Sequence, residues 1–117
     1  MTEDAWDQRL AGLGTESLEG GLTLHIARSS RERRRGLAKM APLPEDHGLR
    51  ILKCNSVHTF GMRFALDLVW LGRGGRVVRV DRDVRPGRVK LCVRARSVVE
   101  ARSGHGDRFA DALAEGI

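Results

Sequence analysis

The residues with the widest chemical range in this chain lie in one run, 54–71. A thiol, an imidazole and a thioether, from Cys54, His58 and Met62, recur at every fourth position, and Asp67 follows inside a segment rich in Phe, Leu, Val and Trp. An unpaired carboxylate in such an apolar segment would cost several kcal/mol, so Asp67 should have a partner. We therefore expect any functional site of this protein in this run.

Sulfur and imidazole ligands of this kind suit Cu(I), or Zn(II) if the thioether is left out. Residues four apart lie about 13 Å apart along a strand and about 6 Å apart along a helix, so all three reach one ion only if the segment folds back. Gly61 would permit such a loop. The alternative, which we favour, is that Cys54, His58 and Met62 are packing residues and that no cofactor is bound.

The same run also allows nucleophilic catalysis, with Cys54 as the thiolate, His58 as the base and Asp67 orienting the imidazole. No strand-to-helix elbow or oxyanion-hole motif accompanies Cys54 in the sequence. We therefore rank a Cys54-dependent enzyme or redox protein below metal binding, and favour a protein that is not an enzyme.

A polar pocket is the interpretation that we favour for function. Asp67 and Glu100 interrupt β-like apolar segments, and Arg63 and the arginines of 31–35 are the obvious counter-ions. Pairing of Arg35 with either carboxylate would be architectural. The functional version arranges the polar groups around a small polar or anionic ligand, or a protein partner. The expected lining is Cys54, His58, Thr59, Met62, Arg63, Asp67 and Glu100.

The formal net charge of +6 favours contact with polyanions such as nucleic acid, anionic lipid or acidic protein. Arginines dominate a ribbon at 73–96. Cys92 would lie on the same strand face as Lys90 and Arg94, and their positive charge would lower the pKa of an exposed thiol there. Aromatic residues are too few, at 4%, for single-strand binding by base stacking. No nucleic-acid-binding motif accompanies the ribbon, so polyanion binding is an alternative and a solvated face is the simpler interpretation.

The first half of the chain predicts one strand, one helix and a loop. Alternation at 22–27 places the apolar residues on one strand face and His25 on the solvent side. Ser29 and Glu32 form a capping box, which predicts a helix that ends before Pro42. Its apolar positions turn inward and its basic residues surround the solvent side.

The second half predicts mostly strands. Residues 49–53 and 64–71 are strands, the second buried on both faces, with a turn at 72–75 and an antiparallel return at 76–80. Alternation over 89–96 predicts a half-buried strand whose inward set is Val89, Leu91, Val93 and Ala95, with a basic outer face. A short strand at 98–100 and a helix at 109–115 follow. We predict a β-dominated α+β fold with a mainly antiparallel sheet or a half-closed small barrel and two short helices.

A chain of 117 residues forms one domain with one core. Glycines punctuate residues 1–20, which we interpret as a loosely structured leader or a short surface helix ahead of a single domain at 21–117. No segment reaches the roughly 18 apolar residues that cross a bilayer, and the acidic start is unlike a secretory signal. We expect a cytoplasmic monomer with free thiols.

The order of several motifs resembles the domain-of-unknown-function 192 family. The resemblance covers about 22–117 and implies a compact β-rich domain, but no established reaction. The chain ends about where relatives continue into a final strand that contains Gly-Asp. The matching elements are Arg33-Arg34-Arg35-Gly36-Leu37, Cys54-x-x-Val57-His58-Thr59-Phe60-x-Met62-Arg63-Phe64-x-x-Asp67-x-Val69-x-Leu71, Arg85-Pro86 and Val99-Glu100-Ala101-Arg102-Ser103-Gly104.

Overall fold

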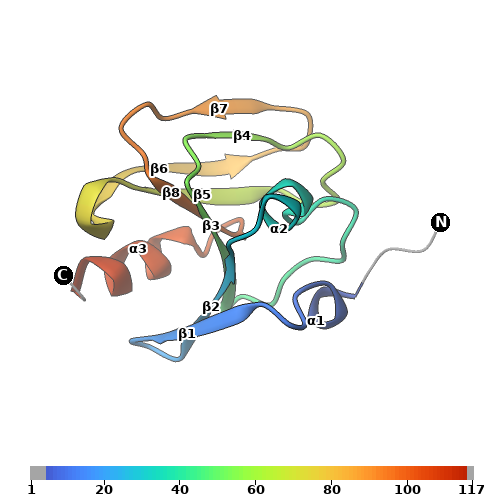
Figure 1. Ribbon diagram of the computed structural model, residues 1–117, viewed down its shortest axis with the longest axis horizontal. Coiled ribbons are helices and arrows are strands. Elements are labelled where there is room, and N and C mark those ends of the chain that lie inside the picture. The colour runs from blue at the N-terminus through green and yellow to red at the C-terminus, as the bar shows by residue number, and fades with distance from the viewer. Residues whose placement is uncertain (1–4, 116–117) are drawn as a thin grey trace.

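The computed structural model describes residues 5–115, so residues 1–4 of the expected leader and the terminal 116–117 lie outside the described residues. A six-stranded sheet has the order β1-β2-β3-β8-β5-β6, and β4 and β7 form a separate two-stranded sheet (Figure 1). The strands are β1 Gly14–Leu18, β2 Leu22–Ala27, β3 His47–Leu52, β4 Ser56–His58, β5 Leu66–Leu71, β6 Val77–Val84, β7 Val89–Leu91 and β8 Ser97–Arg102. The helices are α1 Trp6–Arg9, α2 Ser30–Arg35, the 3-10 turn η1 Arg73–Gly75 and α3 Gly106–Glu115.

The expected β-dominated α+β fold is confirmed. All pairs of neighbouring strands are antiparallel except β2 and β3, which run parallel and are joined through α2. The large sheet is open and does not close into a barrel. Within residues 5–115, no helix is long and apolar enough to cross a membrane.

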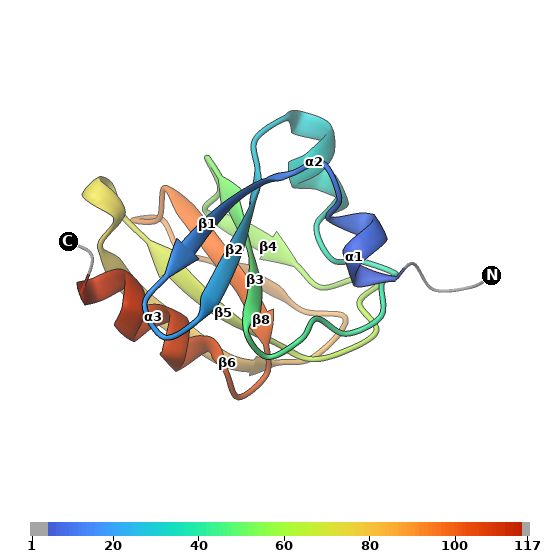
Figure 2. The same cartoon turned by 90° about the horizontal axis from the view of Figure 1, so that it is seen from below.

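The large sheet carries a core on each face, so the expectation of a single core is wrong. α3 covers one face, while α2 and the small sheet lie over the other (Figures 1 and 2). Phe109 of α3 packs with Val69 and Val99 on the first face, whereas Trp70 and Leu68 belong to the core on the second. All six residues of β5 are buried, as its apolar sequence predicted. The same alternation along β8 decides which of its side chains face α2.

The capping box at the start of α2 is confirmed. Ser29 Oγ accepts the Glu32 N–H, and the Glu32 carboxylate accepts the Ser29 N–H in return. The expected continuation of the helix toward Pro42 is wrong, because Gly36 has φ 47° and ψ −135° and ends it after Arg35. The chain then runs irregularly back to the sheet.

The orientation expected for 89–93 is also wrong, although Ala95 is buried as expected. Val89, Leu91 and Val93 are 59%, 62% and 87% exposed, whereas Cys92 is buried. The strand ends at Leu91, and a turn in which the Ala95 N–H donates to the Cys92 carbonyl follows. The small sheet therefore turns the apolar side of β7 away from the core.

His25 is buried rather than solvent-facing. Trp6 of α1 packs over His47 with ring centroids 4.6 Å apart, and His25 Nε2 lies 2.9 Å from His47 Nδ1. Burial, and then the neighbouring His47, lower the pKa of His25. Residues 5–20, which we interpreted as leader, thus supply α1 over the histidines and the edge strand β1 beside β2.

Candidate functional site

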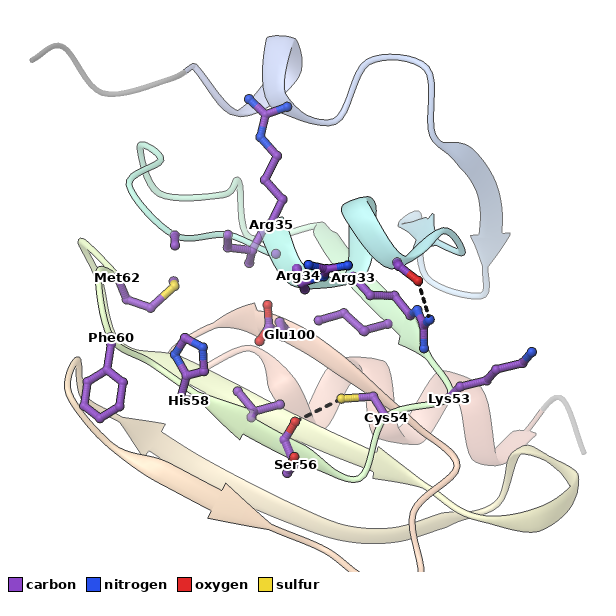
Figure 3. A pocket seen from close by; sticks show the side chains of 16 residues that line it. Arg33, Arg34, Arg35, Lys53, Cys54, Ser56, His58, Phe60, Met62 and Glu100 are labelled. Carbon is purple, nitrogen blue, oxygen red and sulfur yellow. Dashed lines mark hydrogen bonds between the residues drawn. The ribbon is translucent and has the colours of Figure 1, made fainter.

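A cavity of about 370 Å3 opens between α2 and the segment 53–62. Of the seven predicted site residues, four line it: Cys54, His58, Met62 and Glu100. Figure 3 shows these side chains beneath the arginines of α2. The remaining lining comes from Ser30, Arg33, Arg34, Arg35, Gly36, Leu37, Ala38, Ile51, Lys53, Ser56, Val57 and Phe60.

Glu100 is the most unusual group of the cavity. It lies on β8 opposite Leu49 and Leu68 of the neighbouring strands, on the sheet face that α2 covers, and is 4% exposed. Its Oε1 atom is buried and accepts no hydrogen bond from any described residue. Burial raises the pKa of Glu100 to about 7. This carboxyl can therefore donate or accept a proton near neutral pH.

Gly36 explains how the chain passes close to this carboxyl. Its φ of 47° lies in the left-handed region, which favours glycine. A Cβ added at Gly36 would lie 3.6 Å from Glu100 Oε1. The glycine thus ends α2 and leaves the space beside the carboxyl open.

Cationic side chains form the rim above Glu100. Arg33 is half-buried, donates from Nη2 to Ser30 Oγ at 3.3 Å, and its buried Nε has no partner among the described residues. Arg34 and Lys53 are exposed at the same mouth. Figure 3 shows the Arg35 side chain pointing away from Glu100, so the rim next to the carboxyl is formed by the other cations. The cavity therefore combines a buried acid with a basic entrance.

Cys54 and His58 occupy the opposite wall. The Cys54 thiol donates to the Ser56 carbonyl at 3.1 Å. Burial raises its pKa above the ordinary value, and Glu100 acts in the same direction, while the Ser56 contact and Arg33 oppose the rise. His58 is exposed and stacks on Phe60, with ring centroids 5.3 Å apart. These surroundings favour a neutral thiol over the thiolate that a nucleophile needs.

Asp67 and Thr59 lie outside the cavity lining and hold backbone segments. Asp67 is on the opposite sheet face from Glu100, where its carboxylate accepts the N–H groups of Asp83, Gly104 and Gly106 at 2.8–3.1 Å. These three N–H groups are the hydrogen-bond partners that we expected for the Asp67 carboxylate. Thr59 Oγ1 donates to the Arg85 carbonyl at 2.7 Å and accepts the Arg88 N–H at 2.8 Å, which fixes the turn before β7.

Arg63 is exposed and also lies outside the cavity lining. The structure therefore does not bring together the expected group of Thr59, Arg63 and Asp67 with the cavity residues. Cys54, His58 and Met62 do share the cavity, as a soft-metal site requires. In the described part of the chain, no three His, Cys, Asp or Glu side chains are grouped to hold a metal ion.

The sequence profile of the DUF192 family, described as "Uncharacterized ACR", matches residues 14–110. The chain belongs to this family. The motifs that carry the resemblance are far apart in sequence, yet three of them meet at the cavity: Gly36-Leu37, the run from Cys54 to Met62, and Glu100. The other element, Arg85-Pro86, adjoins the turn that Thr59 holds.

Two solved structures share the fold of this DUF192 chain. One is a protein of unknown function from Novosphingobium aromaticivorans DSM 12444, with 17% identity, a TM-score of 0.66 and coverage of 85% of this chain and 88% of that chain. The other, from Sinorhizobium meliloti 1021, is titled a "putative transcription regulator", with 17% identity, a TM-score of 0.68 and coverage of 81% and 82%. No curated protein sequence matches the chain.

Gly36 and Lys53 are cavity residues that were not predicted, and Arg33 and Arg34 were predicted only as counter-ions. A usable signal was present, because the capping box is followed by the Arg-Gly-Leu element. A glycine that ends a short helix returns the chain toward the sheet. In this DUF192 chain that return places the basic helix end over β8.

Proposed function

We propose that this DUF192 protein is a small-molecule binding domain without a reaction of its own. Its ligand carries an N–H donor, from an amine or amide, at one end and an acidic group at the other. The donor meets Glu100 inside the cavity, and the acidic group meets Arg33 and Lys53 at the rim. The single observation that carries the proposal is the buried Glu100 oxygen without a partner in residues 5–115.

The physical argument is that a buried carboxyl without a hydrogen-bond partner is costly, by roughly 1–3 kcal/mol for a neutral group and more for a charged one. A ligand N–H at Oε1 would remove that cost on binding. An ammonium group would also favour the ionised carboxyl, so its binding would release a proton near neutral pH. The apolar walls, including Leu37, Ile51 and Val57, would shield this contact from water.

The test is a thermal-shift panel of amino acids, simple amines, amides and carboxylic acids, followed by calorimetry of the best compound. We expect compounds with both groups to raise the melting temperature, and Glu100→Gln to weaken their binding by about tenfold. Glu16→Gln on the exposed edge strand β1 is the matched control and should bind normally. Stabilisation that persists in Glu100→Gln, or a panel in which no such compound binds, would refute the proposal.

A soft-metal site is the second candidate, because Cys54, His58 and Met62 line one cavity. As proposed, the domain needs no cofactor, so neither Cu(I) nor Zn(II) should bind to it stoichiometrically. Native mass spectrometry on protein without an affinity tag distinguishes the two ideas. A stoichiometric ion that is lost in His58→Ala would establish the metal site instead.

Cytoplasmic location and a monomeric state belong to the same proposal. Both cysteines are free, Cys54 half-buried and Cys92 buried, as a reducing compartment would keep them. Fractionation of cells and sedimentation of the purified chain test these two points.

A further inference from the structure

The outer face of the small sheet is an apolar surface turned to solvent. Four large hydrophobic side chains in the described part of the chain are more than half exposed, and all four lie on or beside this sheet: Phe60, Val89, Leu91 and Val93. They form what we name the apolar row. In a basic, hydrophilic chain such a row indicates a contact surface.

The strand register makes the row continuous. Val89 pairs with His58 and Leu91 pairs with Ser56, so these residues share the outward face, and His58 stacks on Phe60. Alternate side chains of a strand lie about 7 Å apart, which matches the spacing of an extended partner chain. β4 and β7 lie, like α2, on the side of the large sheet away from α3 (Figure 1). The exposure of Val89 and Leu91 shows that no helix within residues 5–115 covers their outward side.

A basic hollow of about 590 Å3 continues the row beyond Val93. Its cations are Arg73 and Arg76 from the β5–β6 turn and Arg94 and Arg96 from the turn after β7. The two turns are held together by the Arg96 N–H, which donates to the Leu71 carbonyl at 2.7 Å.

Gly72 allows the close approach of these turns. A Cβ added there would lie 2.8 Å from Val78 Cγ1 and 3.2 Å from the Arg94 carbonyl oxygen. The close contact of the two turns thus positions the hollow, which is lined by arginine residues from both of them.

The charge of the hollow is not compensated within residues 5–115. Asp81 pairs with Arg79, and Asp107 pairs with Arg82. None of the four arginines of the hollow forms an ion pair with a described carboxylate. Anionic groups of a partner are thus the complementary occupants.

We propose that this face docks an extended acidic segment of another protein, with apolar side chains on the apolar row and carboxylates in the basic hollow. A second copy of this chain is a poorer occupant, because it would add its own uncompensated arginines to the interface. An anionic membrane is also less suited, since the aromatic anchors typical of membrane interfaces are missing here except for Phe60. Trp70 is buried, and Trp6 packs on the histidine pair.

Fluorescence anisotropy with a synthetic peptide tests the docking. The probe alternates Leu and Thr over six residues and ends in four Glu, and a second peptide replaces each Leu by Ser. We expect the first peptide to bind more weakly as salt is added, and Leu91→Ser and Arg94→Glu each to weaken it by about tenfold. Arg108→Glu on α3, on the far side of the sheet, is the charge-matched control and should bind unchanged.

Every other outcome overturns the proposal. Equal binding of the Ser peptide, or equal loss in Arg108→Glu, would leave only non-specific charge attraction. A dimer in sedimentation that dissociates in Leu91→Ser would assign the face to a second copy, and Leu91-dependent binding to phosphatidylglycerol vesicles without peptide binding would assign it to a membrane. Glu100→Gln should not affect the peptide, so failure here is separate from failure of the ligand proposal.

Discussion

Replacing the buried carboxyl of Glu100 by an amide should remove a large part of the pH dependence of stability. Burial raises the pKa of Glu100 from 4.5 to about 7. Because the pKa is higher in the folded protein, the folded state holds a proton that the unfolded chain releases between these values. The contribution of Glu100 to stability is therefore present below pH 4.5, is lost progressively as the pH rises to 7, and stays lost above it.

A pKa difference of this size corresponds to about 3 kcal/mol of unfolding free energy, of which about 2 to 3 kcal/mol develops between pH 5 and pH 8. As the pH rises from 5 to 8, the unfolding free energy of Glu100→Gln should thus increase by about 2 to 3 kcal/mol relative to that of the wild type. The unpaired amide of glutamine has its own cost, but that cost is equal at both pH values. The difference between the two conditions isolates the carboxyl.

The assay is urea unfolding followed by tryptophan fluorescence at pH 5 and pH 8, for the wild type, Glu100→Gln and the exposed control Glu16→Gln. Titration of other groups is common to all three proteins and cancels in the comparison. If the unfolding free energies of the wild type and Glu100→Gln change in parallel from pH 5 to pH 8, Glu100 is not a desolvated acid.

Three further predictions concern groups other than Glu100. Asp67→Asn should lower the unfolding free energy by about 3 kcal/mol, because an amide cannot accept all three backbone N–H groups. Urea unfolding measures this loss, with the exposed Asp111→Asn as the control. A loss of unfolding free energy no larger than that of the control would contradict the role of Asp67. Cys54 should react slowly with iodoacetamide at neutral pH, since burial raises its thiol pKa; peptide mapping that finds it alkylated as fast in the native as in the urea-unfolded protein would show the opposite. The imidazole of His25 should titrate below 6.5 in NMR, because burial and His47 lower its pKa. The unfolded chain then binds more protons than the folded protein, so this group reduces stability as the pH falls below 6.5. A titration above 6.5 would be inconsistent with the packing of His25.

Local sequence signals were enough for much of the fold. The capping box at Ser29 and Glu32 is satisfied within three residues, so its geometry follows from the sequence. The apolar run of 66–71 predicted a strand buried on both faces, and the glycine-rich turn after it predicted the antiparallel return of β6. Each of these features depends on neighbours along the chain.

Features that depend on distant segments were not predictable in the same way. Alternation along β7 shows that Val89 and Leu91 share a face, but the packing of Val57 and Cys92 against the core decides which face is buried. His25 is covered by Trp6, which comes from the part of the chain taken as leader.

The candidate site shows the same division. Cys54, His58 and Met62 could be grouped from their spacing, and they share the cavity with Glu100. Asp67 was expected beside them, but its strand parity places it under α3, where donors from 83, 104 and 106 reach it. A carboxylate in an apolar strand predicts a partner without indicating which sheet face holds that partner.

Carbon-13 NMR titration of the Glu100 carboxyl shows whether the cavity presents a buried acid to a ligand. The protein is labelled at glutamate, the resonance is assigned with Glu100→Gln, and the titration is repeated with the best compound of the ligand panel. We expect a pKa near 7 in the free protein, and a lower pKa when an ammonium-bearing compound is bound. A pKa near 4.5 that no compound of the panel changes would contradict this expectation.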